Sequence, residues 1–205
     1  RAVSQYERGR PEGMKFLYEF CYGLITASGI AQGLFVLYKN PRSRINVLWA
    51  VMSFAVAAWA LEGRYFFEPD RQKALIGWRL SNPAAIFIPV FFTHFCLALL
   101  NKPLKESRVA IAGYIFAISI GIGTLSQTSW FIPSVSPKPP FLHWANPGPL
   151  YVAFTVLFFV LVFYSHWLLF KHLHEQPWER QNQIRLVAIA TIIGYACGST
   201  TLLLV

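Results

Sequence analysis

Residues 150–170 read LYVAFTVLFFVLVFYSHWLLF, a run of mostly apolar and aromatic residues without one Asp, Glu, Lys or Arg. The hydrocarbon core of a bilayer is about 30 Å thick, and about 20 apolar residues cross it as an α-helix. Inside that core every backbone amide and carbonyl group needs an internal partner, which a helix provides. This stretch therefore predicts a transmembrane helix and decides the class of the fold.

Five further runs without acidic or basic residues repeat this pattern along the chain of 205 residues. Charged residues make up only 13% of the chain, whereas soluble domains carry about 25%. We therefore predict an all-α, polytopic helical membrane bundle. The expected transmembrane helices are six, at about 16–38, 45–67, 76–100, 108–128, 149–171 and 183–205.

The connections between these helices are short, with two exceptions. Residues 68–75 are polar, and residues 129–148 are rich in proline and aromatic residues, so we expect a loop at each place. Neither loop carries a Walker A, HExxH or GxSxG motif, and catalytic machinery in solvent would need longer polar segments. We therefore expect that the chain is not an enzyme.

The two ends of the sequence indicate where the transmembrane bundle begins and that the polypeptide continues. Residues 1–15 form an N-terminal segment, and residues 16–205 form the transmembrane bundle. The chain begins with Arg1, so we expect the native start at Met14 or an upstream sequence before Arg1. The last apolar run stops at Val205 without a polar flank, so we expect the native polypeptide to continue with a seventh apolar stretch.

The basic residues favour one orientation in the membrane. Three basic residues lie in or beside each of the connections at residues 39–44, 102–108 and 171–185. Loops with an excess of Lys and Arg usually face the cytoplasm. The count of Lys and Arg differs between the two sides of the membrane only when the N-terminal segment is left out. We therefore expect these connections in the cytoplasm and the N-terminus outside. The net charge of +9 then reflects topology, and no nucleic acid is expected as a partner.

Glu62 is the most informative acidic residue, because a charge within a membrane segment is costly and often functional. It lies in WALEGRY, residues 59–65, at the outer end of the second expected helix. An ion pair with Arg64 or Arg79 would offset that cost. We identify Trp59, Glu62, Arg64, Arg79 and His94 as candidate ligand-binding residues; the simpler interpretation of Glu62 is an interfacial carboxylate in contact with water.

Two histidines lie at matched depth in two expected helices. His94 precedes the end of the third helix and His166 precedes the end of the fifth, so both lie toward the cytoplasmic face. Histidine pairs of this kind can ligate haem iron or chlorophyll magnesium. We expect no cofactor and no metal, and keep haem or chlorophyll at His94 or His166 as the alternative. His172, His174 and Glu175 are interpreted as a polar helix end.

Small residues in two helices have the spacing of helix-packing motifs. Gly29 and Gly33 form GxxxG in the first helix, and Gly194 and Gly198 form it in the sixth. Such glycines allow two helix backbones to approach closely. We interpret both motifs as ordinary packing within the bundle.

Four stretches together resemble a known family. They are YKNPRSRINVLWAVMSFAVAAWAL at residues 38–61, FFTHFCLALLNKP at 91–103, NPGPLY at 146–151 and ERQNQIRLVAIATIIGYACGS at 179–199. In this order they resemble the N-terminal seven-transmembrane sensory region of bacterial histidine kinases, over roughly residues 16–205. The resemblance implies a seventh helix and cytoplasmic signalling domains beyond this chain, and so a truncated seven-helix bundle. It also implies a location in the bacterial inner membrane.

We weigh three functions against these observations. The resemblance favours a non-catalytic transmembrane sensory or input module that responds to a small or apolar molecule or to a membrane state. The alternative is a structural or auxiliary subunit of a larger photosynthetic or respiratory membrane complex. A transporter would need broken helices and inverted repeats, which we do not detect. The expected partners are the lipid bilayer and other membrane subunits or a second copy of the chain.

Overall fold

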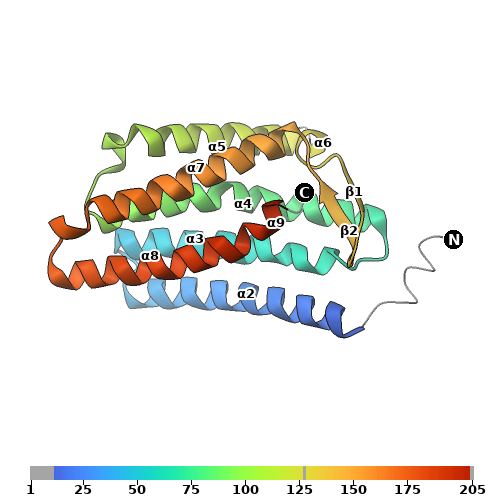
Figure 1. Cartoon of the computed structure of the whole chain (residues 1–205), viewed down its shortest axis with the longest axis horizontal. Coiled ribbons are helices and arrows are strands. Elements are labelled where there is room, and N and C mark those ends of the chain that lie inside the picture. Colours follow the sequence, from blue (N-terminus) through green and yellow to red (C-terminus); the bar gives the residue numbers. More distant parts are fainter. Residues whose placement is uncertain (1–11, 127, 204–205) are drawn as a thin grey trace.

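The computed structural model describes residues 12–126 and 128–203, and the N-terminal segment expected at residues 1–15 lies mostly outside this range. Long helices run side by side along the molecule (Figure 1). They are α2 (Glu12–Lys39), α3 (Arg44–Ala60), α4 (Arg71–Leu99), α5 (Arg108–Ser126), α7 (Pro149–Lys171) and α8 (Trp178–Gly198). The predicted helical membrane bundle is confirmed.

Shorter elements fill the connections and define the two ends of the bundle. One end, here called the loop end, carries the turn before α3, η2 (Leu104–Glu106) and η3 (Leu173–Glu175). The other, here called the hairpin end, carries η1 (Leu61–Tyr65), α6 (Thr128–Phe131), β1 (Ser134–Lys138), β2 (Phe141–Asn146) and α9 (Thr200–Leu203). Figure 1 shows the loop end at the left and the hairpin end at the right.

Two helices begin at side chains that satisfy their free amide groups. The hydroxyl oxygen of Ser43 accepts a hydrogen bond from the amide of Asn46 at the start of α3. The Asp70 carboxylate accepts bonds from the amides of Gln72 and Lys73 over 2.8 and 3.3 Å at the start of α4. Such caps stabilise helix starts by about 1 kcal/mol. The Asp70 cap explains why α4 begins five residues before its predicted start near residue 76.

The described residues contain five helices that are long and apolar enough to cross a membrane. They correspond to the first five predicted spans. The sixth predicted span is helical as α8, but it does not reach the same apolarity because its first two turns are polar, WERQNQIR at residues 178–185. The described apolar part of α8 therefore covers only residues 186–198, and α9 follows it.

The proline-rich connection is more ordered than the predicted loop. β1 and β2 form an antiparallel hairpin in which Val135 pairs with Ala145 and Ser136 pairs with Trp144. The side chain of Asn146 fastens its open end, because its amide donates to the Ser134 hydroxyl and its carbonyl oxygen accepts from the Ser136 hydroxyl. Both bonds are 2.8 to 2.9 Å long. The hairpin is thus held by both backbone and side-chain bonds.

The hairpin is fixed to the end of the second span. The amides of Leu142 and His143 both donate to the carbonyl oxygen of Phe66, over 2.9 and 3.2 Å. The Phe66 ring is fully buried and packs on Phe141 and Trp144 with ring centres 5.0 and 5.2 Å away. The hairpin consequently forms a lid over this end of the bundle.

The glycine pair of the first helix packs as predicted, and the pair in α8 does not. A Cβ added to Gly29 would lie 2.8 Å from the carbonyl oxygen of Ser53, and one added to Gly33 would clash with the ring of Phe54. α2 and α3 therefore approach closely along this face. A Cβ on either glycine of the α8 pair would meet no atom within 4 Å of it among the described residues.

Candidate functional site

A cavity of about 220 Å³ lies toward the hairpin end of the bundle, between α3, α4, β2, α7 and α8. Its wall is mostly aromatic and aliphatic, as in most small-molecule sites. The aromatic residues that line it are Trp59, Trp78, Trp144, Tyr151, Phe154, Phe158 and Tyr195. The few polar residues of the wall are Glu62, Asn82 and Thr191, together with the tyrosine hydroxyl groups.

Glu62 provides the one acidic side chain of this wall among the described residues. It belongs to η1, where α3 tightens into a 3-10 turn, and only 2% of its surface is exposed. The side-chain amide of Asn82 donates a hydrogen bond of 3.2 Å to its Oε2 atom. Asn82 also donates to the carbonyl oxygen of Trp78 over 2.9 Å, which fixes the amide on α4.

The carboxyl group of Glu62 has no ion-pair partner within the part of the chain that the structure describes. The ion pairs found there join Lys15 to Glu19 and His172 to Glu175. The predicted pairing of Glu62 with Arg64 or Arg79 is therefore wrong. The interpretation of Glu62 as a carboxylate in water is wrong as well, because its side chain is buried.

The two arginines that were predicted as partners of Glu62 have other surroundings. Arg64 is exposed at the surface of η1. Arg79 donates from Nε to the carbonyl oxygen of Ile132 over 3.0 Å and from a terminal nitrogen to that of Pro133 over 3.3 Å. Those two carbonyl groups lie between α6 and β1, so Arg79 anchors the hairpin to α4. Neither arginine lines the cavity.

The tryptophans at the hairpin end form a connected cluster. Trp78 and Trp144 meet edge to face with ring centres 5.4 Å apart, and Phe66 packs on both rings. The indole nitrogen of Trp78 donates to the carbonyl oxygen of His143 over 3.3 Å. The indole nitrogen of Trp144 is buried without a hydrogen-bond acceptor among the described residues. Trp144 also lines the cavity.

His94 lies away from the cavity, at the boundary of α3, α4 and α5. The guanidinium group of Arg44 contacts its Nε2 atom at 2.7 Å, and the hydroxyl of Tyr114 contacts its Nδ1 atom at 2.8 Å. Because a guanidinium group only donates, Nε2 is the acceptor and its lone pair is engaged. His94 therefore ties three helices together, and the structure does not bring it to the other four predicted site residues.

His166 connects the cavity wall to α7. Its Nδ1 atom donates to the carbonyl oxygen of Val162 over 2.8 Å, since a carbonyl only accepts. Its Nε2 atom forms a hydrogen bond of 3.0 Å with the hydroxyl of Thr191, which lines the cavity from α8. A buried hydrogen bond of 2.8 Å between Thr93 and Ser165 joins α7 to α4 in the same region. The Thr191–His166 bond thus connects the cavity wall on α8 to α7, and the Thr93–Ser165 bond connects α7 to α4.

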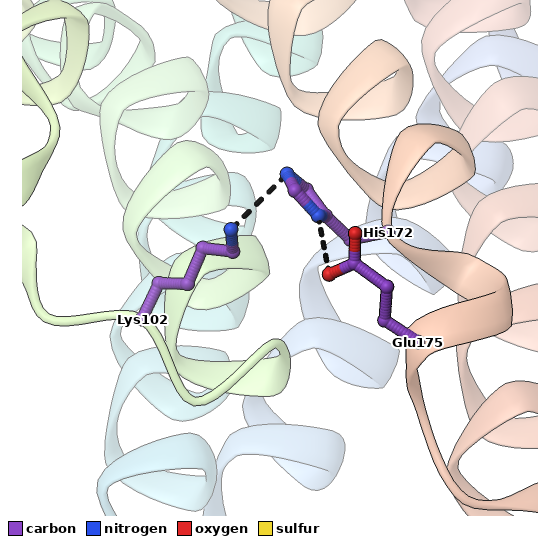
Figure 2. Close-up of polar contacts among 3 residues, drawn as sticks. All are labelled: Lys102, His172 and Glu175. Atoms are coloured by element: carbon purple, nitrogen blue, oxygen red, sulfur yellow. Dashed lines mark hydrogen bonds and ion pairs between the residues drawn. The ribbon is translucent and has the colours of Figure 1, made fainter.

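The polar residues after α7 form a small cluster at the loop end, which Figure 2 shows. Nδ1 of His172 contacts the Glu175 carboxylate at 2.7 Å, and its Nε2 atom contacts the Lys102 ammonium group at 3.1 Å. His174 is exposed. The cluster joins the turn after α4 to the turn after α7. Within residues 12–126 and 128–203, no three His, Cys, Asp or Glu side chains gather as a metal site.

Sequence reasoning found Trp59 and Glu62 but missed the rest of the cavity wall. Asn82 could have been found, because it is an amide inside the long uncharged run of the third predicted helix, where polar groups are costly. Trp144 and Tyr151 gave no such signal. Trp144 reaches the cavity because the hairpin folds back onto Phe66, a contact between segments about 80 residues apart, and Tyr151 reaches it from the first turn of α7.

The fold and this cavity define a helical membrane protein with a buried acidic group in an aromatic site. Residues 22–203 match the family described as the N-terminal 7TM region of histidine kinase, so the chain belongs to that family. This region is the sensory input part of such kinases, which agrees with the resemblance seen in the sequence. Comparison with curated proteins and with solved structures gives no match.

Proposed function

We propose that the chain is a non-catalytic transmembrane input module of a bacterial signalling protein, and that the aromatic cavity is its stimulus-binding site. The observation that carries this proposal is the position of Glu62. A buried carboxyl group without an ion-pair partner among the described residues is costly to maintain, and it lines a cavity large enough for a small molecule. Polar groups with this arrangement usually serve ligand recognition.

In this proposal, two of the five residues expected to bind a ligand contact it directly, and a third acts indirectly. Trp59 and Glu62 contact the bound molecule from the end of the second span. Arg79 positions the hairpin that carries Trp144. Arg64 and His94 have no contact with the ligand, because neither residue lines the cavity.

A sensor must also pass the binding event to the other face of the membrane. Thr191 lines the cavity on α8 and contacts His166 on α7; α7 ends and α8 begins beside η3 at the loop end. A ligand that displaces Thr191 by a small distance changes the relation of α8 to α7. Helix shifts of about 1–2 Å are typical of such transitions.

In this proposal the loop end lies in the cytoplasm and the hairpin end outside, in the bacterial inner membrane; the basic residues of the connections at the loop end support this orientation. The cavity then lies in the extracytoplasmic half of the bilayer, where an external molecule can arrive. The lipid bilayer and a second copy of the chain or other membrane subunits are the proposed partners. No observation favours the structural-subunit alternative.

A cavity-filling variant tests the binding site. Ala190 lines the cavity but is exposed, so Ala190→Phe adds volume there without displacing a packed neighbour. Ala196→Phe is the matched control, on the exposed surface of the same helix and outside the cavity wall. The unfolding temperature is measured for each protein with a panel of small aromatic, aliphatic and amphiphilic molecules.

Since a ligand stabilises only the state that binds it, panel members that fit the cavity raise the unfolding temperature. We expect this rise in the unsubstituted protein and in Ala196→Phe, and its loss in Ala190→Phe. A panel without any stabilising member, or equal stabilisation of Ala190→Phe, would contradict the proposal.

A further inference from the structure

The wall of the cavity carries one kind of charge. Glu62 is acidic, and no Lys, Arg or His side chain contributes to the wall among the described residues. The remaining polar groups, Asn82 and Thr191, are uncharged. An anionic molecule would therefore find no cationic side chain in this wall to compensate its buried charge, so the wall favours other ligands.

The aromatic rings around Glu62 supply a second recognition element for positive charge. Trp59, Trp78 and Trp144 line the cavity together with Tyr151 from α7. The face of an aromatic ring attracts a cation, most strongly for tryptophan and most when water is excluded. A carboxylate surrounded by such rings combines ionic and cation–π attraction in one site.

A metal cation does not fit this site. Metal ions need several oxygen, nitrogen or sulfur ligands, and no group of three His, Cys, Asp or Glu side chains exists among the described residues. The volume of about 220 Å³ also exceeds that of the engineered cavity of about 150 Å³ that binds benzene. The space therefore suits an organic molecule slightly larger than one aromatic ring.

From these observations, and resting on the proposed ligand site, we propose that the cavity binds an organic cation, an ammonium group carried on a small apolar body. The ammonium group lies against Glu62 and the tryptophan rings, and the apolar body fills the space toward Phe154 and Phe158. The ammonium group belongs either to a free amine or to a lipid headgroup. Both sources offer the same chemistry to the site.

The probe pair for the test is benzyltrimethylammonium and its uncharged isostere neopentylbenzene, in which carbon replaces nitrogen. Dissociation constants are determined at known free concentrations for the whole chain in dodecyl maltoside, a detergent without an ammonium group. The variants are Glu62→Gln, which keeps the shape of the side chain, and Glu106→Gln, an exposed carboxylate in η2 at the opposite end.

We expect the cation to bind the unsubstituted protein about tenfold or more tightly than its isostere, as cation–π and ionic attraction in a dry site would give. Glu62→Gln loses that preference and keeps the affinity for the isostere, which also shows that this variant is folded. Glu106→Gln behaves as the unsubstituted protein. Added phosphatidylethanolamine that competes with the cation assigns the ammonium group to a lipid; a lack of competition assigns it to a free amine.

Equal binding of the two probes to the unsubstituted protein overturns the inference, whether or not Glu62→Gln folds. If both probes then lose affinity in Ala190→Phe, the cavity remains a ligand site and only its preference for cations is wrong. If neither probe binds and no panel molecule stabilises the protein, the proposed function fails with it.

Discussion

The side-chain amide of Asn82 donates a hydrogen bond of 3.2 Å to the carboxyl group of Glu62, and both side chains are buried. The two residues belong to different elements, η1 and α4, that meet below the hairpin. Asn82 thereby orients the acidic group that the described residues contribute to the cavity wall. Several properties of the molecule depend on this contact.

Removal of Asn82 should destabilise the bundle. Asn82→Ala leaves the buried Glu62 carboxyl group without its amide donor, and we expect the free energy of unfolding to fall by about 1–3 kcal/mol. Reversible unfolding in mixed micelles measures the change. Asn182→Ala, a half-buried amide near the start of α8, is the control and should change stability much less. An equal loss in both variants would show that the Asn82–Glu62 contact is energetically unimportant.

The close approach of α2 to α3 predicts a contrast between two glycines of the same helix. Gly29→Ala places a methyl group 2.8 Å from a backbone oxygen of α3, and we expect a loss of about 1–3 kcal/mol in stability. Gly23→Ala meets no atom within 4 Å and should be neutral or stabilise the helix by up to about 1 kcal/mol. The same unfolding assay compares them. A Gly29→Ala protein as stable as Gly23→Ala would contradict the packing of these two helices.

Cysteine labelling tests the orientation in the membrane. Ser107 is a poor labelling position because it is buried and its hydroxyl accepts from the amide of Ala110. Glu106→Cys at the loop end and Gln72→Cys at the hairpin end are exposed and leave every basic residue in place. In a background without the three native cysteines, an impermeant maleimide applied to intact cells should label Gln72→Cys only. Labelling of Glu106→Cys from outside would reverse the topology.

The histidine contacts predict a protein without haem or chlorophyll. Both ring nitrogens of His94 and of His166 already have hydrogen-bond partners, so neither ring offers a free lone pair to a metal. The absorption spectrum of the purified protein should therefore show no haem or chlorophyll band. A band that disappears in His94→Ala or His166→Ala would establish the cofactor that we do not expect.

The spans could be predicted from the sequence because each is a local property of an uncharged run. The boundaries of α7, Pro149–Lys171, coincide with their prediction. The hairpin could not be predicted, because residues 134–146 contain three prolines and gain their order from contacts with Phe66, far away along the chain. Its attachment is a tertiary effect that no local pattern reveals.

The candidate site was predictable only in part, for a related reason. Glu62 is conspicuous because a carboxyl group lies next to an apolar run, and Trp59 lies one helical turn before it. Arg64 and Arg79 appeared as its partners by charge and proximity in the sequence. In the structure Arg64 is exposed, and Arg79 donates to backbone carbonyl groups just before β1. Opposite charge alone therefore did not predict the partner of Glu62.

A molecule bound in the cavity should change the arrangement of the helices at the loop end. This prediction is tested by the distance between spin labels at Glu106→Cys in η2 and Gln183→Cys in α8, both exposed, in a cysteine-free background. The measurement compares the empty protein with the protein saturated by the panel molecule that stabilises it most. We predict a shift of about 1–2 Å or more in the mean distance, absent when Ala190→Phe fills the cavity. Identical distance distributions at saturation would contradict a sensory role for this cavity.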